Sequence, residues 1–172
     1  MTRQLDLILR EGGAEYDWQW DLEVNSNYLD SKGKSWLKEI LEDLGGNGSF
    51  PLLEKLKFDF KIGRHLILWD DELRFHRYRL ITFRSELYSE MTFSFSEAHK
   101  RLCRTYEKEA LKSGMQPRIW QGPPLAKSLF GEASEPGDFS GNGAPGWKLS
   151  AYNDAQIDLQ TRIHGYKLIR LN

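Results

Sequence analysis

The stretch from Lys57 to His76, KFDFKIGRHLILWDDELRFH, places acidic side chains within and beside apolar runs. Asp59 stands between two phenylalanines, and Asp70 with the two acids after it closes the run LILW. The composition around Asp59 predicts a strand, and the glycine at 63 predicts a turn before a second strand. A carboxylate near the interior of a sheet costs several kcal/mol unless it is paired, hydrogen-bonded or bound to a cation. Because two acids on neighbouring strands often build a divalent-metal site, the stretch predicts both a hairpin and a candidate site.

The sequence on either side of this hairpin predicts a mixed α/β protein. Residues 16–24 alternate apolar with polar side chains, which is typical of a strand. An apolar stripe after Ser31, the expected N-cap, predicts a helix that the glycine pair at 45–46 ends. We expect one domain of the α/β (α+β) class, with a central mixed sheet of four to six strands flanked by helices on both sides. The expected strands are 16–24, 56–62, 65–69, 73–83 and 166–171, and the expected helices are 31–44, 94–114 (opened by a capping box) and 151–163.

Length and charge limit the kinds of function to be considered. A chain of 172 residues is long enough for one well-buried domain. The 24 lysines and arginines nearly cancel the 25 aspartates and glutamates, which argues against a generic polyanion binder but allows a local basic patch. Residues 74–84, with arginines among aromatic side chains, could form such a patch for a phosphate backbone and unstacked bases, or an ordinary exposed strand face.

The cysteine content and the apolar segments indicate the compartment. The single cysteine, Cys103, excludes an internal disulfide and fits a reducing compartment, and we expect it to be a packed thiol. The amino-terminal sequence MTRQLDLILREGG lacks the long apolar segment of a secretory signal. No apolar run approaches the roughly 18 residues that a membrane span needs. We therefore expect a soluble, cytoplasmic protein without a membrane partner.

A segment rich in glycine and proline covers residues 115–146. Its length predicts a long loop or flap, which more often carries function than a short connection does. Clustered glycines let backbone amides approach a phosphate, and Lys148 stands where the next helix would begin, so Lys148 is a candidate phosphate contact. The spacing of a P-loop is absent. A lid over a site, a connector anchored by Trp147, and an enzyme pocket lined by Trp120, Trp147 and Lys148 are the alternatives.

The acids of the hairpin carry a resemblance to a known family. Asp59 is followed by phenylalanine, Asp70 stands eleven residues later, Glu72 two further on, and His76 four after that. With a helix before them, a third strand that carries the histidine, and a helix followed by a strand ending in arginine near the end of the chain, this order resembles the PD-(D/E)XK nuclease superfamily, within it the proteins similar to very-short-patch repair endonucleases. The resemblance covers about residues 31–83 well. It implies a restriction-endonuclease-like fold that acts on the phosphodiesters of DNA or another nucleic acid.

The resemblance also implies a mechanism. Asp59 and Asp70 would bind one Mg²⁺, which polarises the scissile phosphate and lowers the pKa of an attacking water. Glu72 or His76 would orient that water or protonate the leaving oxygen, which completes the candidate catalytic set. The residues expected to stabilise phosphate charge are Arg77 and Arg79.

A second register of the same motif leads to the opposite conclusion. The family usually has glutamate where this chain has Asp70, and glycine after the second acid, where this chain has Leu73. A shifted alignment places Leu68 at the glutamate position and Arg74 at the histidine position. In that register the chain would be a catalytically inactive relative, and the sequence alone does not choose between the two.

The same acids can also be interpreted without any catalytic site. Asp70 can belong to a hairpin turn, Asp59 can pair with Lys57 or Lys61, and His76 can be an exposed strand residue. A non-catalytic binding or interaction protein is therefore the alternative function. In a metal site both carboxylates lie within reach of one ion, whereas in a non-catalytic protein each is held by a lysine or an arginine.

Overall fold

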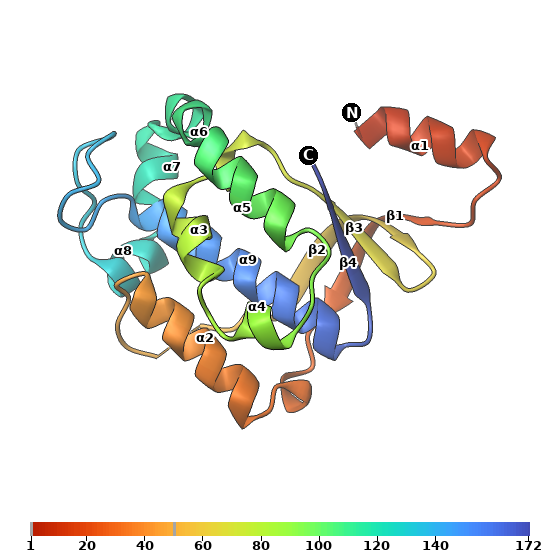
Figure 1. Cartoon of the computed structure of the whole chain (residues 1–172), viewed down its shortest axis with the longest axis horizontal. Coiled ribbons are helices and arrows are strands. Elements are labelled where there is room, and N and C mark those ends of the chain that lie inside the picture. Colours follow the sequence, from red (N-terminus) through yellow and green to blue (C-terminus); the bar gives the residue numbers. More distant parts are fainter. Residues whose placement is uncertain (1, 50) are drawn as a thin grey trace.

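The protein has a small sheet at one end and a larger body of helices beside it (Figure 1). The computed structural model describes residues 2–49 and 51–172. In that part of the chain the strands are β1 (Asp17–Glu23), β2 (Lys55–Ile62), β3 (His65–Trp69) and β4 (Lys167–Leu171). The α-helices there are α1 (Thr2–Glu11), α2 (Ser31–Asp43), α3 (Arg77–Thr82), α4 (Leu87–Glu90), α5 (Ser96–Thr105), α6 (Glu107–Gly114), α7 (Pro117–Gln121), α8 (Pro124–Phe130) and α9 (Pro145–Ile163). Two short 3₁₀ helices occupy Ser26–Tyr28 and Glu72–Arg74.

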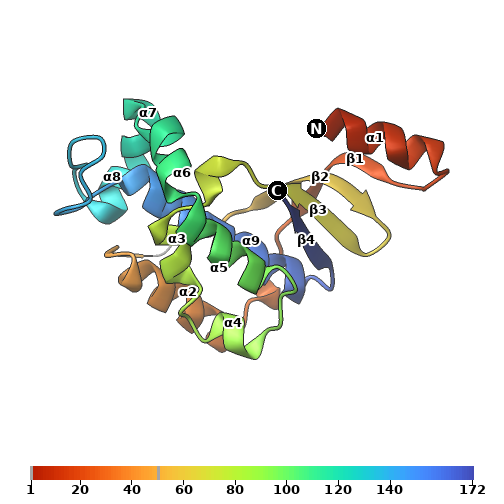
Figure 2. The same cartoon turned by 45° about the horizontal axis from the view of Figure 1, so that its top comes forward.

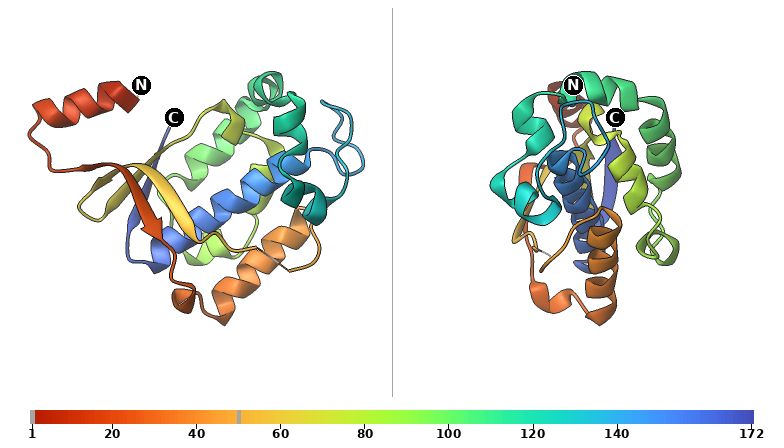
Figure 3. Two further views of the ribbon diagram at one scale, coloured as in Figure 1. Left: turned by 180° about the vertical axis from the view of Figure 1, so that it is seen from behind. Right: turned by 90° about the vertical axis from the view of Figure 1, so that its left-hand side faces the viewer.

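The sheet is mixed, with strands in the order β1-β2-β3-β4. β1 pairs antiparallel with β2, and β2 with β3. The turn between β2 and β3 contains Gly63, whose φ of 55° suits glycine because it has no Cβ. β3 and β4 are parallel, so the chain between them must cross back over the length of the sheet. All helices from α3 to α9 lie in this crossover, and α9 leads the chain into β4 (Figures 1 and 3).

Helix α9 is the centre of the helical body. It contacts α2, α3, α7, α8 and β4, and Figure 3 shows it running through that body. Its apolar residues Tyr152, Ala155 and Leu159 are fully buried, but so are Asp154 and Asp158. A helix enclosed on all sides buries polar positions as well, and buried carboxylates need partners.

Two apolar clusters hold these layers together. The larger joins α2 to α9 and includes Trp120 and Trp147, which are the largest of the fully buried side chains. The smaller packs Phe58 and Leu168 of the sheet against Phe95 at the start of α5. Because each large apolar side chain stabilises the fold by roughly 1.5 to 3 kcal/mol when fully buried, these clusters fix the position of α9 relative to the sheet.

The expected third strand at 73–83 is wrong. These residues form a short 3₁₀ helix and then helix α3. His76 is the N-cap of α3, and its Nδ1 accepts a hydrogen bond from the backbone N–H of Arg79 at 3.3 Å. Tyr78, Arg79 and Thr82 are buried at helical spacing. The mixture of arginines and aromatic residues therefore belongs to the faces of a helix, not to the two sides of a strand.

The segment 115–146 is more ordered than a long loop. It contains the short helices α7 and α8, each with proline in its first turn. Helix α9 likewise begins with Pro145, six residues before the expected start at 151. Proline lacks the N–H that a first-turn residue leaves unpaired, so these prolines start helices here instead of breaking them.

Two helix starts also differ from the sequence-based expectation. The N-cap of α2 is Asp30, not Ser31, because the Asp30 carboxylate accepts a hydrogen bond from the N–H of Gly33 at 2.7 Å. The expected helix 94–114 is divided at Tyr106 into α5 and α6. The capping box is not formed, since α5 begins after Phe95 without a side-chain cap.

The class of fold is confirmed. The chain forms one mixed α/β domain around a four-stranded mixed sheet. Helix α1 stands apart from the helical body (Figure 2), with Leu7 and Ile8 exposed. Among the described residues, no helix combines the length and the apolar character needed to cross a membrane.

Candidate functional site

Asp59 lies in the middle of β2, as the sequence predicts. Its side chain is partly buried, and Oδ2 accepts a hydrogen bond from the backbone N–H of Trp69 at 2.7 Å. The residue pairs between β2 and β3 run from Phe60 to Ile62, so the carboxylate of Asp59 joins Trp69, the last residue of β3, to β2 beyond these pairs. This bond satisfies one of the two oxygens of Asp59.

A pocket of about 540 Å³ opens around Asp59. Gln19 is among its lining residues, and the pairs Trp18–Phe60 and Trp20–Phe58 place Gln19 opposite Asp59. Gln19 has a φ of 51°, and no other non-glycine residue in the described part of the chain has a positive φ. Such a conformation costs roughly 1 to 3 kcal/mol and is found most often at binding and active sites. We call this hollow the Asp59 pocket; it is lined by Gln19, Asp21, Lys57, Phe58, Asp59, Leu68, Trp69 and Arg74.

Arg74 connects the Asp59 pocket to the interior of the protein. Its Nη1 donates to Asp154 Oδ1 at 2.9 Å, and its side chain is 33% exposed while that of Asp154 is 1% exposed. The negative charge of Asp154 raises the pKa of Arg74 despite burial. One end of the guanidinium is thus anchored on a buried carboxylate while another part borders the pocket.

Behind Arg74 lies a network of buried charges centred on Arg170 in β4. The Nη1 of Arg170 donates to Asp70 Oδ1 at 2.7 Å, and its Nε donates to Asp158 Oδ1 at 3.0 Å. The other oxygen of Asp158 accepts from Arg79 at 2.6 Å and from the hydroxyl of Tyr88 at 2.7 Å. We call this set the Arg170 network: Asp70, Arg74, Arg79, Asp154, Asp158 and Arg170.

The three arginines of the Arg170 network balance its three aspartates. Burial raises the pKa of Asp70 against the opposing charge of Arg170, whereas the charges of Arg74 and Arg170 outweigh burial at Asp154 and hold its pKa well below the ordinary value. We regard Asp70 as ionised, because its 2.7 Å partner is a guanidinium that does not lose its proton. Removing Arg170 would leave Asp70 buried without a cationic partner, whereas Asp154 and Asp158 would each keep one arginine.

Two histidines and the cysteine of the interior are neutral. Burial lowers the pKa of His76 to about 3 and that of His99 to about 2. His76 stacks on Trp147 with 4.7 Å between the ring centroids, and His99 Nδ1 lies 3.6 Å from Asp70 Oδ2. Burial also raises the pKa of Cys103 to about 12, which fits the expected packed thiol.

The four predicted catalytic residues occupy different surroundings. Asp59 lines its pocket, Asp70 is held by Arg170, and His76 is a buried helix cap. Glu72 lies on a 3₁₀ helix, where it accepts a hydrogen bond from the hydroxyl of Ser113 at 3.0 Å. These contacts do not gather the four residues around one reacting group.

The magnesium prediction can be tested against the contacts of Asp70. A Mg²⁺ shared with Asp59 would have to displace Arg170 from Asp70, so this carboxylate does not fit the role of a metal ligand in its present contacts. In residues 2–49 and 51–172 no group of three or more acidic, histidine or cysteine side chains is arranged to hold a metal ion. The magnesium site stays a prediction.

The three predicted phosphate contacts do not share a surface. Arg77 makes a two-bond ion pair with Glu107, at 2.7 and 3.1 Å. Arg79 is fully buried beside Asp158, because residues 77–82 are helical and turn it inward. Lys148 is largely buried against aromatic rings, and burial lowers its pKa.

Sequence reasoning missed most of the Arg170 network. Asp154, Asp158 and Arg162 stand at four-residue steps, a spacing typical of an ion-pair stripe along a helix, but both aspartates are fully buried. The available signal was the apolar character of α9 on several faces, which predicts enclosure. Arg170 gave a weaker signal, as a cation flanked by Ile169 and Leu171 within the strand KLIRL.

The fold and the site define a mixed α/β protein with a polar pocket backed by a buried ion network. A family model matches residues 39–172, so the chain belongs to this family, DUF7255, which is a family of unknown function. No curated protein matches the chain, and no solved structure matches it.

Proposed function

We propose that this protein is a non-catalytic nucleic-acid-binding protein on a nuclease-like frame, and that the Asp59 pocket receives the phosphate backbone. The observation that carries the proposal is that Asp59, Leu68 and Arg74 line the same pocket. These are three of the positions that the second register of the nuclease motif assigns to one site, and its second acid falls on Asp70. The first register instead needs Asp70 as a metal ligand, whereas Asp70 faces Arg170 in the interior.

The topology supports the nuclease-like frame. Helix α2 precedes the hairpin that carries Asp59, and α9 precedes β4, which lies parallel to β3. This order of helix, antiparallel strands, helix and parallel strand agrees with the order on which the resemblance rests, except for the third strand, whose expected residues 73–83 are helical. The motifs on which the resemblance rests contain no counterpart of helices α3–α8, which lie between β3 and α9.

The chemistry of the Asp59 pocket supports binding without metal-dependent cleavage. Leu68 has no atom that could ligate a cation, and Arg74 brings a fixed positive charge to the pocket. Lys57 is a second cation on the same lining. Where a nuclease uses a metal ion to attract a phosphate, these two side chains can do so directly.

The remaining lining suits the bases of a single strand. Trp69 is partly buried on the pocket wall, and an aromatic ring of this kind stabilises a stacked base by roughly 1 to 3 kcal/mol. Gln19, Asp21 and Asp59 supply hydrogen-bonding groups beside the cations. The mixed charge of the pocket favours a nucleotide over a simple anion.

Fluorescence anisotropy with labelled single-stranded and duplex oligonucleotides tests binding. We expect the single strand to bind better, and Lys57→Glu to weaken binding by about tenfold or more, since a charged contact contributes about 1.5 to 3 kcal/mol. Lys108→Glu, on the exposed surface of α6, is the matched control for the charge change. Absence of binding to either oligonucleotide at low salt, or an equal loss in both variants, would refute the proposal.

A nicking assay on supercoiled plasmid tests the non-catalytic part. Metal titration calorimetry with Mg²⁺ and Mn²⁺ runs in parallel, on the wild type and on Asp59→Asn. We expect no metal-dependent nicking from either protein. Nicking that requires Mg²⁺ and disappears in Asp59→Asn would restore the first register and an active nuclease. Asp59→Asn is preferred to Asp70→Asn because the latter also disturbs the buried network.

A further inference from the structure

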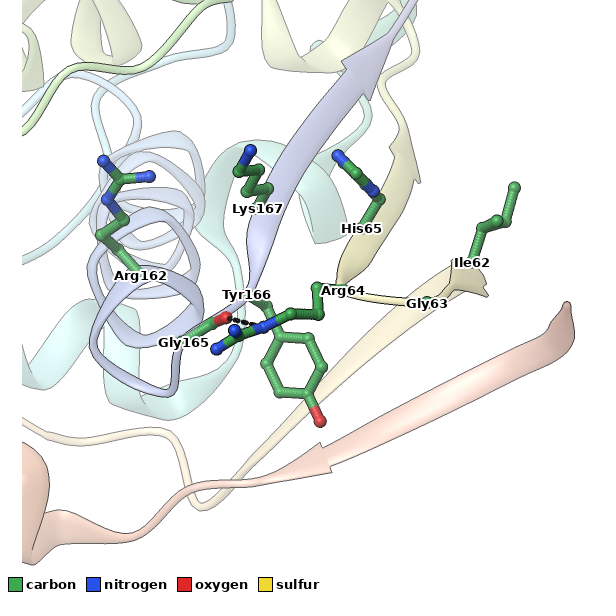
Figure 4. A pocket seen from close by; sticks show the side chains of 8 residues that line it. All are labelled: Ile62, Gly63, Arg64, His65, Arg162, Gly165, Tyr166 and Lys167. Carbon is green, nitrogen blue, oxygen red and sulfur yellow. Dashed lines mark hydrogen bonds between the residues drawn. The ribbon is translucent and has the colours of Figure 1, made fainter.

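A second pocket, of about 720 Å³, lies at the other end of the β2–β3 hairpin, beside its turn (Figure 4). Arg64 comes from that turn, His65 from the start of β3, Arg162 from the last turn of α9, and Lys167 from the start of β4. We call it the basic pocket; it is lined by Ile62, Gly63, Arg64, His65, Arg162, Gly165, Tyr166 and Lys167. No acidic side chain belongs to this lining.

The fold fixes where the cations of the basic pocket lie. His65 and Lys167 are paired residues of the parallel strands β3 and β4, so they are direct neighbours. In Figure 4 their side chains and that of Arg162 point to the same side of the ribbon. Arg64 is anchored by a hydrogen bond from its Nε to the carbonyl oxygen of Gly165 at 3.1 Å, which leaves its Nη groups for a ligand.

These cations are not neutralised by the protein. Within the described part of the chain, Arg64, Arg162 and Lys167 form no ion pair. Lys61, on the same hairpin, contrasts with them because it pairs with Asp17 at 2.8 Å. Like charges held side by side destabilise a sheet, and their positive potential attracts a counter-ion.

The carboxyl end of α9 does not neutralise them either. The last turn of a helix carries the equivalent of about half a negative charge. Arg64, Arg162 and Lys167 surround it, and one carbonyl near this end, that of Gly165, is already bonded to Arg64. Three positive charges less about half a negative charge leave a net charge of about +2.5 facing the pocket.

A smaller hollow of about 280 Å³ continues from the basic pocket. It shares Arg162, Tyr166 and Lys167 with the basic pocket, and adds the hydroxyl residues Thr92 and Ser94. Asp158 also borders it, but the oxygens of Asp158 are occupied by Arg79 and Arg170. The combined space extends beyond what a single inorganic phosphate would fill.

We propose that the basic pocket binds the phosphate group of a nucleotide-sized ligand. Arg64 and Arg162 contact the phosphate oxygens as forked donors, and Lys167 adds a point charge. The rest of the ligand extends toward the hydroxyl groups of the adjoining hollow. This phosphate belongs either to a free mononucleotide or to the 5′ end of a nucleic acid, and the inference does not depend on the Asp59 pocket.

Titration calorimetry with three probes tests the basic pocket: adenosine monophosphate, a 5′-phosphorylated tetranucleotide, and the same tetranucleotide with a 5′ hydroxyl. The variant is Arg162→Glu/Lys167→Glu. The matched control is Arg101→Glu/Arg104→Glu, which makes the same charge change on the exposed face of α5. Thermal melting first establishes that both variants are folded.

We expect a phosphorylated probe to bind the wild type and the control, and to bind the pocket variant at least about tenfold more weakly. Binding of the mononucleotide identifies a small ligand. Binding of the phosphorylated tetranucleotide alone identifies a nucleic-acid end. The proposal is overturned if neither phosphorylated probe binds at millimolar concentration, if the 5′-hydroxyl strand binds equally well, or if the control loses as much affinity as the pocket variant. If the Asp59 pocket does not bind nucleic acid, the anisotropy experiment with the wild type and Lys57→Glu shows it, and the titrations of the basic pocket are unaffected.

Discussion

Replacement of Arg170 by methionine removes the central cation of the Arg170 network. Methionine approximates the length of arginine but has no charge and makes no ion pair. Asp158 would keep Arg79 and Asp154 would keep Arg74. Asp70 would lose its 2.7 Å partner. Its other ionisable neighbour, His99, is neutral because burial lowers the pKa of His99 to about 2, so it cannot replace Arg170.

The expected loss of stability follows from the single buried carboxylate, that of Asp70, that is left without a cationic partner. Breaking a buried ion pair from one side destabilises a protein by about 3 to 5 kcal/mol. For a domain of this size that corresponds to a fall in Tm of roughly 6 to 20 °C. Since domains are stable by only about 5 to 15 kcal/mol, Arg170→Met is expected to use a large part of the total stability.

Urea unfolding followed by circular dichroism measures this loss, with Asp70→Asn/Arg170→Met as the companion variant. The double variant removes the stranded charge, so we expect it to be more stable than Arg170→Met alone. The pH supplies an independent check. Without Arg170 the pKa of Asp70 rises further above its unfolded value of 3.8.

The sign of the pH effect follows from that rise. A carboxyl group with a raised folded-state pKa is most favourable to the fold when protonated, and this contribution is lost as the pH rises through the folded-state pKa. The deficit of Arg170→Met relative to the wild type should therefore be smallest at acidic pH and grow toward neutrality. A loss below about 1 kcal/mol at neutral pH, or a double variant less stable than the single one, would refute the reasoning.

Three further predictions concern the interior. Because burial raises the pKa of Cys103 to about 12, its thiol should not react with Ellman's reagent at neutral pH until urea unfolds the protein, and rapid native-state labelling would contradict this. Because burial lowers the pKa of His76 from 6.5 to about 3, stability should fall as the pH drops below 6.5, and His76→Phe should show a shallower fall in urea titrations; an unchanged slope would count against it. In Gly114→Ala the added Cβ would meet the indole of Trp147, so a loss of about 1 to 3 kcal/mol is expected, and an unchanged urea midpoint would show that the ring can move aside.

The hairpin that carries Asp59 was predictable because its information is local. Alternation, β-branched residues and a glycine turn sufficed to place β2 and β3 within one residue of their observed bounds. Residues 73–83 were not predictable in this way. Their arginines and aromatic residues fit a strand by composition, and only the cap at His76 and the burial of Tyr78 against the helical core make them a helix.

The candidate site likewise has features that the sequence predicted and features that it could not predict. The sequence predicted that Asp59 and Asp70 need partners, because a carboxylate in an apolar setting is unfavourable alone. It could not name the partner of Asp70, since Arg170 lies 100 residues away along the chain. Long-range partners depend on how β4 and α9 pack against the hairpin, and no local sequence pattern predicts that packing.

The sequence by itself determined the mixed α/β class, the position of the central hairpin and the presence of acids that require compensation. The tertiary structure decided that Asp70 faces Arg170 while Asp59 shares a pocket with Leu68 and Arg74. The physical reason is the range of the forces involved. Backbone preference and alternation act over a few residues, whereas the partner of a buried charge is chosen by the assembled core, which excludes water and makes each unpaired charge costly.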